Sequence, residues 1–131
     1  MSKAAVSVKV FGVYLVGLGL VLLTVPNLLL AAFAIPATDE VWIRVMGVLI
    51  INMGANYWHA AITGARAHLM ATVFARLFVF VSFTAFAVLR LTTIGIIPFG
   101  AVDLAGAVWT WVELRREAGR AGRVTPATPA R

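Results

Sequence analysis

The chain has 131 residues, of which 62% are hydrophobic and only 12% are charged, with a formal net charge of +6. A soluble domain of this length would expose far more charge, so the composition argues against one and predicts a single-domain integral membrane protein. The absence of cysteine excludes a disulfide framework and a thiolate metal site. The basic residues gather at the ends of apolar stretches rather than in one patch, so we expect no nucleic-acid partner.

The first apolar stretch, residues 8–33, is too long for one membrane crossing and is interrupted at Pro26. We predict a spanning helix over about residues 5–24, because roughly 20 residues cross a hydrocarbon core. A short interfacial helix is predicted to follow over residues 27–34, with Asn27 as its N-terminal cap. A single long helix that bends at the proline is the alternative.

Lys3 lies before this apolar stretch and Lys9 at its start, as basic residues precede the apolar part of a secretory signal peptide. The stretch is longer than the roughly 7–15 apolar residues of such a signal, and three further apolar stretches follow it. We therefore expect an uncleaved first helix.

Three more apolar stretches predict three more spans, over about residues 41–63, 69–91 and 94–114. Each is about 20 residues long, the length that crosses a bilayer. The sequence therefore predicts an all-α fold, a four-helix transmembrane bundle over residues 1–117. Residues 118–131 are rich in Gly, Pro, Ala and Thr, and we predict a disordered cytoplasmic tail there.

The distribution of basic residues predicts the orientation of the chain. Asp39 and Glu40 lie in the loop after the first helix, whereas Lys and Arg lie near both termini and in the loop between the second and third spans. Because basic residues favour the cytoplasmic side, both termini are expected in the cytoplasm of a bacterium, with the protein in its inner membrane. These basic residues are Lys3, Lys9, Arg66, Arg115, Arg116, Arg120, Arg123 and Arg131.

The helix over residues 41–63 concentrates its polar side chains on one face. At about 100° per residue they fall in a stripe about 120° wide, which we interpret as an interior wall of the bundle. The face with Met46 and Met53 suits lipid, and the edge with Gly47, Gly54 and Ala61 lets a neighbouring helix approach closely. The stripe consists of Arg44, Asn52, Asn56, His59, Thr63 and Arg66.

Arg76 and Asp103 are the ionisable residues deepest in the third and fourth spans. At a rise of 1.5 Å per residue they lie roughly 10 and 15 Å above the cytoplasmic ends of their helices. Asn52, Asn56 and Tyr14 are at similar heights, so these five side chains are predicted to converge on one ligand-binding site. Arg76 and Asp103 are expected to form an ion pair, either structural or functional, because an unpaired charge in lipid is costly.

Two further candidates for binding are His59 and Arg44. His59 is expected to be a hydrogen-bonded wall residue, with a pH-switch or metal-binding role as the alternative. Arg44 belongs to a shallower group near the outer face, with Trp42 and Arg90, and its side chain can also extend to the lipid headgroups. Asp103 is the only deep carboxylate, so a two-carboxylate mechanism is not expected, and no metal site is predicted.

Several short motifs resemble the small four-helix bacterial membrane proteins grouped as DoxX-like. They are "VPNLLLAAFAIP", "VWIRVMG", "MGANYWHAA", an arginine in the third span and "VDLAGAVWT". The resemblance implies a four-helix membrane fold, mostly without established activity, although some relatives are associated with quinone-linked oxidoreductase complexes. The matching positions are Pro26, Pro36, Trp42, Arg44, Gly47, Tyr57, Arg76, Asp103 and Trp109.

The sequence favours a non-enzymatic accessory subunit or a binder of lipid or a lipophilic small molecule in a polar intramembrane cavity. The first alternative is a membrane subunit that positions a quinone-like ligand for a redox partner. The second is a small transporter, which would act as a dimer because four helices enclose little volume. The partners expected are membrane lipid, a lipophilic small molecule, and a second copy or a larger membrane complex, with quinone as the one candidate cofactor.

Overall fold

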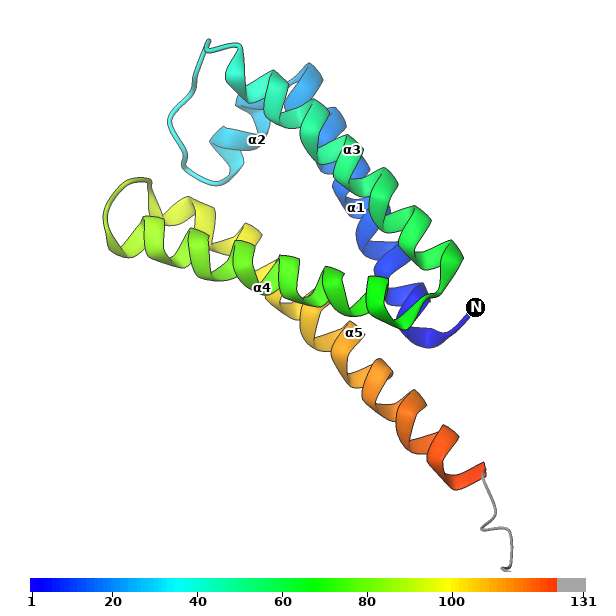
Figure 1. Cartoon of the computed structure of the whole chain (residues 1–131). Coiled ribbons are helices and arrows are strands. Elements are labelled where there is room, and N and C mark those ends of the chain that lie inside the picture. Colours follow the sequence, from blue (N-terminus) through cyan, green and yellow to red (C-terminus); the bar gives the residue numbers. More distant parts are fainter. Residues whose placement is uncertain (125–131) are drawn as a thin grey trace, which may run out of the picture.

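The computed structural model describes residues 1–124, and its regular structure over that range is entirely helical. Four segments, α1, α3, α4 and η1 with α5, are long and apolar enough to cross a membrane, as predicted and as is typical of a multi-pass membrane protein. The elements are α1 (Lys3–Thr24), α2 (Pro26–Ala32), α3 (Trp42–Thr63), α4 (Arg66–Val88), the short 3₁₀ helix η1 (Ile94–Ile96) and α5 (Ile97–Val124) (Figure 1).

Pro26 ends the first long helix, as predicted, and does not merely bend it. Val25 leaves the helical region with φ −133° and ψ 56°, because a residue before proline is disfavoured in the α conformation. Pro26 then opens α2, so Asn27 lies inside the first turn and the predicted Asn27 cap is wrong. Its side-chain Oδ1 instead accepts a hydrogen bond of 2.9 Å from the Thr38 backbone N–H, which ties the following loop to α2.

The last helix is longer than the sequence predicted. α5 continues to Val124, so residues 118–124 are helical where we expected the start of a disordered tail. Ala and Arg favour helix in this segment, and just before it Arg116 pairs with Glu113 one turn earlier at 2.9 Å. The final turns project beyond the other helices (Figure 1). The rest of the predicted tail, residues 125–131, lies outside the described residues.

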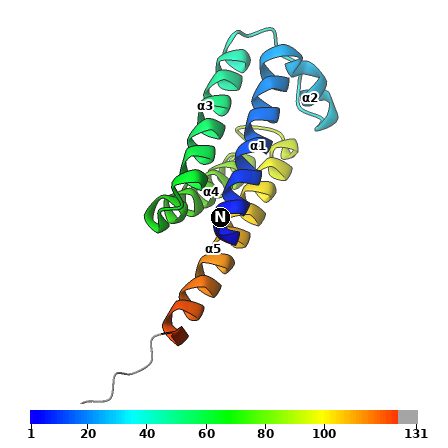
Figure 2. The ribbon, with the colours of Figure 1, turned by 90° about the vertical axis from the view of Figure 1, so that its right-hand side faces the viewer.

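The long helices form two antiparallel hairpins. α1 packs along α3 and α4 packs along α5, while α1 also crosses α5. α3 and α4 barely touch although a short loop joins them, and the hairpins diverge away from the N-terminus (Figures 1 and 2). These contacts describe two hairpins joined at one end, and they do not show the evenly closed bundle that the sequence predicted.

Glycines on both helices allow the close packing of α1 on α3. A Cβ on Gly19 would lie 2.6 Å from the Gly47 carbonyl oxygen, and one on Gly54 would lie 2.8 Å from the Gly12 oxygen. No side chain fits at such distances, so only glycine permits the approach. Ala61 is also buried and continues the seven-residue spacing of Gly47 and Gly54. The predicted small-residue edge is confirmed, and its neighbour is α1.

Candidate functional site

Arg76 on α4 is the largest fully buried side chain of the described residues, with 0% of its surface exposed. Its guanidinium carbon lies 4.1 Å from the centroid of the Phe11 ring and 5.0 Å from that of Tyr57. Its Nη1 donates a hydrogen bond of 3.1 Å to Thr110 Oγ1. Aromatic faces attract a cation more strongly where water is excluded, so three other helices hold this charge: α1, α3 and α5.

Thr110 connects Arg76 to α1. It is fully buried, and its Oγ1 lies 2.8 Å from the Oγ of Ser7, which is also buried. A Cβ on Gly106 would lie 3.0 Å from Arg76 Nη1 and 2.9 Å from Phe11 Cδ2, so a side chain at this position would displace the guanidinium or the ring. We call Ser7, Phe11, Tyr57, Arg76 and Thr110 the Arg76 cluster.

Two nitrogens of the Arg76 guanidinium have no hydrogen-bond acceptor among the described residues. Its Nε and Nη2 are buried and make no hydrogen bond to any of the described residues, although a guanidinium offers five N–H donors. A buried donor without an acceptor costs about 1–3 kcal/mol, and more when it is charged. An oxygen supplied by a bound molecule would remove this cost.

The direct ion pair between Arg76 and Asp103 that we predicted is wrong. Within residues 1–124, the one ion pair shorter than 4.0 Å joins Arg116 to Glu113. Helical side chains lean toward the N-terminus of their own helix. In antiparallel α4 and α5, this lean carries Arg76 toward Thr110 and Asp103 in the opposite direction. Asp103 is half-buried.

Tyr14 lies beside the Arg76 cluster, as predicted. Its ring centroid is 5.3 Å from that of Phe11, the ring that also faces the Arg76 guanidinium. Of the five side chains predicted to converge, the structure therefore brings Tyr14 and Arg76 together, both against Phe11.

The polar stripe of α3 is not an interior wall, and that interpretation is wrong. Asn52, Asn56 and His59 are all exposed, and Asn56 Nδ2 donates to the Asn52 backbone oxygen at 2.8 Å. The face of α3 that carries Gly47 and Gly54 lies against α1. Since the polar stripe is nearly opposite those glycines around the helix, their packing on α1 turns the stripe outward.

Comparison with protein-family models, with curated proteins and with solved structures finds no match to the chain. The DoxX-like resemblance is therefore untested and stays a prediction. Among the described residues, no three His, Asp or Glu side chains are grouped to hold a metal ion.

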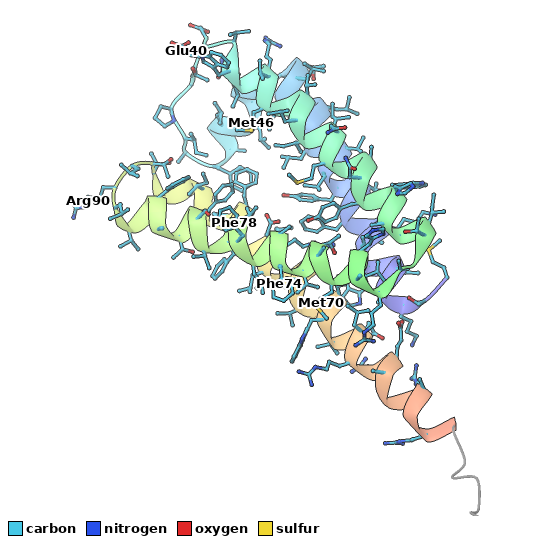
Figure 3. The ribbon with its side chains drawn as sticks, in the orientation of Figure 1. Glu40, Met46, Met70, Phe74, Phe78 and Arg90 are labelled. Atoms are coloured by element: carbon cyan, nitrogen blue, oxygen red, sulfur yellow. The ribbon has the colours of Figure 1, made fainter. Side chains whose placement is uncertain are left out.

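Arg44 is not part of the Arg76 cluster. It is exposed at the other end of α3, where its Nη1 donates to the backbone oxygens of Leu23 and Thr24. These are among the last carbonyls of α1, which lack helical partners, so Arg44 caps that helix. An open cavity of about 380 Å³ beside it is lined in part by Asp39 and Glu40. Figure 3 shows Glu40 at this end.

Sequence reasoning missed Ser7, Phe11, Gly106 and Thr110. For two of them a signal was present, because Gly106 and Thr110 follow Asp103 at intervals of three and four residues. That spacing places them on one face of a helix with the carboxylate. No periodicity marks Phe11 as the partner of an arginine, because that contact depends on how α1 crosses α5.

Proposed function

We propose that this protein is a non-enzymatic, multi-pass membrane protein that binds a lipophilic molecule whose polar head carries oxygen acceptors. One observation carries the proposal: Arg76 is completely buried, yet its Nε and Nη2 have no acceptor among the described residues. A bilayer core contains no water to complete these bonds. Intramembrane ionisable residues typically mark functional sites.

The chemistry of the Arg76 cluster supports a ligand with a carboxylate, phosphate or carbonyl head. The planar guanidinium presents its donors as a fork that matches such oxygens. Phe11, Tyr57 and Tyr14 add aromatic surface for the apolar part of the ligand. Because α3 and α4 barely touch, we place the entry of the ligand between them. Arg76 has no exposed surface, so the side chains around it must move apart to admit the polar head.

Binding is favoured over catalysis because the cluster lacks a nucleophile with a base. Ser7 is the one serine of the cluster and could in principle act as a nucleophile. Its hydroxyl, however, is hydrogen-bonded to Thr110 and to the Ala4 carbonyl and not to a base. The two histidines of the chain, His59 and His68, are both exposed. Neither histidine is therefore placed to act as a base for Ser7.

A quinone-like ligand is the second candidate, in a protein that serves a redox partner. The specific observation is that Arg76 lies against two aromatic rings, Phe11 and Tyr57. A quinone has a flat ring that stacks on aromatic faces and carbonyl oxygens that accept hydrogen bonds from a guanidinium.

Arg76→Met is expected to abolish ligand binding without unfolding the protein. Methionine fills similar space without charge, and the loss of two charge-assisted hydrogen bonds at about 1.5–3 kcal/mol each weakens binding at least about 100-fold. The measurement is mass spectrometry of lipids and quinones extracted from protein purified in mild detergent, with molar ratios compared between variants.

Arg44→Met is the matched control, because Arg44 is exposed and lies at the N-terminal end of α3, far from Tyr57, the residue of α3 that contacts Arg76. It should retain the same molecule in the same ratio as the unmodified protein. Equal retention by Arg76→Met, or no bound molecule in the unmodified protein, contradicts the proposed function. An ultraviolet absorbance of the extract that changes when the extracted molecule is chemically reduced identifies the ligand as a quinone.

We also propose that both termini face the cytoplasm of a bacterial inner membrane. The charge pattern supports this orientation, since Asp39 and Glu40 lie in the loop opposite the arginine-rich end of α5, and basic residues favour the cytoplasmic side. A membrane-impermeant thiol reagent is expected to label Asp39→Cys in intact cells, and Arg120→Cys only after permeabilisation. The cysteine-free chain gives no background labelling. Labelling of position 39 from the cytoplasmic side alone overturns this topology.

A further inference from the structure

α3 carries two rows of residues at alternating intervals of three and four, the spacing of a helix–helix seam. One row contains Gly47, Gly54 and Tyr57 and lies against α1. The other row, which we call the outer seam, lies on the opposite side and is exposed along its whole length. The outer seam consists of Val45, Leu49, Asn52, Asn56, His59 and Thr63.

The outer seam places hydrogen-bonding groups where lipid cannot satisfy them. Asn52 lies near the middle of α3, roughly 16 Å from Thr63 at 1.5 Å per residue. Asn56 Nδ2 donates within the helix to the Asn52 backbone oxygen, but no hydrogen bond among the described residues involves the Asn52 side chain. Hydrocarbon offers neither donors nor acceptors, so this surface requires a protein neighbour.

A second copy of the chain would carry a matching surface. An Asn side chain carries both a donor and an acceptor, so two such side chains can bond to each other. Two copies inserted in the same direction hold Asn52 and Asn56 at the same depth, and a two-fold axis brings each residue opposite its counterpart. A single Asn in such a seam is known to fix register and the number of strands.

We propose that the protein is a parallel homodimer in which the outer seams of two α3 helices pack across a two-fold axis. Hydrogen bonds between the Asn52 and Asn56 side chains of the two copies fix the register. The Arg76 cluster lies on the other side of α3, through Tyr57, and is left free. The proposed dimer therefore does not depend on whether a ligand binds at the Arg76 cluster.

Disulfide cross-linking in native membranes tests this interface, because the chain contains no other cysteine. Asn52→Cys and Asn56→Cys are expected to form covalent dimers under mild oxidation. Met53→Cys, on another face of α3, and Phe78→Cys, on α4 (Figure 3), are matched controls at positions that are 44% and 73% exposed, and both should stay monomeric. Failure at both asparagine positions, or equal cross-linking at Met53→Cys, overturns the proposal.

The strength of association gives a second, independent readout. In liposomes, energy transfer between labelled copies should fall on dilution with lipid. Asn52→Leu with Asn56→Leu should weaken association about 3- to 30-fold, because lipid solvates leucine as well as a partner helix does, whereas interhelical hydrogen bonds are lost. A monomeric unmodified protein at all lipid ratios points to a different partner chain and overturns the homodimer, as does an unchanged association of the double variant.

Discussion

Gly19→Leu is expected to lower the free energy of unfolding by about 3 kcal/mol, at the upper end of the usual cost of overpacking. A Cβ at this position would lie 2.6 Å from the Gly47 oxygen and 2.9 Å from the Ile51 nitrogen. Both are backbone atoms, so the strain cannot be relieved by a side-chain rotation, and α1 must move away from α3. Denaturant unfolding in mixed micelles, followed by tryptophan fluorescence, measures the change.

Gly17→Leu is the control for this result. Gly17 lies on the same helix, but a Cβ there meets no atom within 4 Å. The same change of residue should therefore alter stability by no more than about 0.5 kcal/mol, as is usual for exposed positions. Equal losses in the two variants would show that α1 does not pack on α3 through Gly19.

Thr110→Val is expected to destabilise the protein by about 3 kcal/mol, because its hydroxyl is the one acceptor given to Arg76 by the described residues. A hydrogen bond to a charged group contributes about 1.5–3 kcal/mol, and its loss leaves the charge buried without an acceptor. Valine also removes the contact with the Ser7 hydroxyl. The unfolding measurement used for the glycine variants gives the loss.

A double-mutant cycle separates the hydrogen bond from general packing. In an Arg76→Met background the charge is absent, so Thr110→Val should cost about 2 kcal/mol less than it does alone. Thr84→Val is the matched control on α4, because Thr84 bonds only to the Phe80 backbone oxygen of its own helix. Additive effects of Arg76→Met and Thr110→Val would rule out a direct bond between these two side chains.

The sequence predicted the helices well because their determinants are local. Apolar length alone locates the four long segments, and Pro26 terminates a helix through the geometry of its own ring. The end of α5 was misplaced because glycines and prolines in the tail outweighed the helix-forming residues between them. Residues 118–124 contain two glycines, which an extended arginine- and alanine-rich helix tolerates at roughly 1 kcal/mol each.

The orientation of α3 required a comparison between helices. The polar stripe and the glycine edge both favour contact with another helix, and from the sequence we placed the stripe in the interior. The decisive signal was the seven-residue spacing of Gly12 and Gly19 on α1, which matches that of Gly47 and Gly54. Close backbone contact is possible only where both helices carry small residues, so this match selects the face.

The candidate site was predicted in its central residue but not in its contacts. The burial of Arg76 follows from the cost of a charge in lipid, and the structure confirms it. Its partner was misassigned because heights along helix axes place Cα atoms, whereas the lean of each side chain decides what the guanidinium reaches. Arg76 and Asp103 have similar heights and lean in opposite directions, so Thr110 receives the hydrogen bond.

The residues that contact Arg76 are translated at different times. Phe11 and Tyr57 precede it in the chain, whereas Thr110 is 34 residues later and leaves the ribosome roughly 2–7 s after Arg76 at 5–20 residues per second. Under the proposed membrane placement, the α1–α3 hairpin precedes α4 into the bilayer, so Phe11 and Tyr57 are available to the incoming cation before α5 follows. The order of translation thus supplies the aromatic partners of Arg76 before the Thr110 hydroxyl that accepts its hydrogen bond.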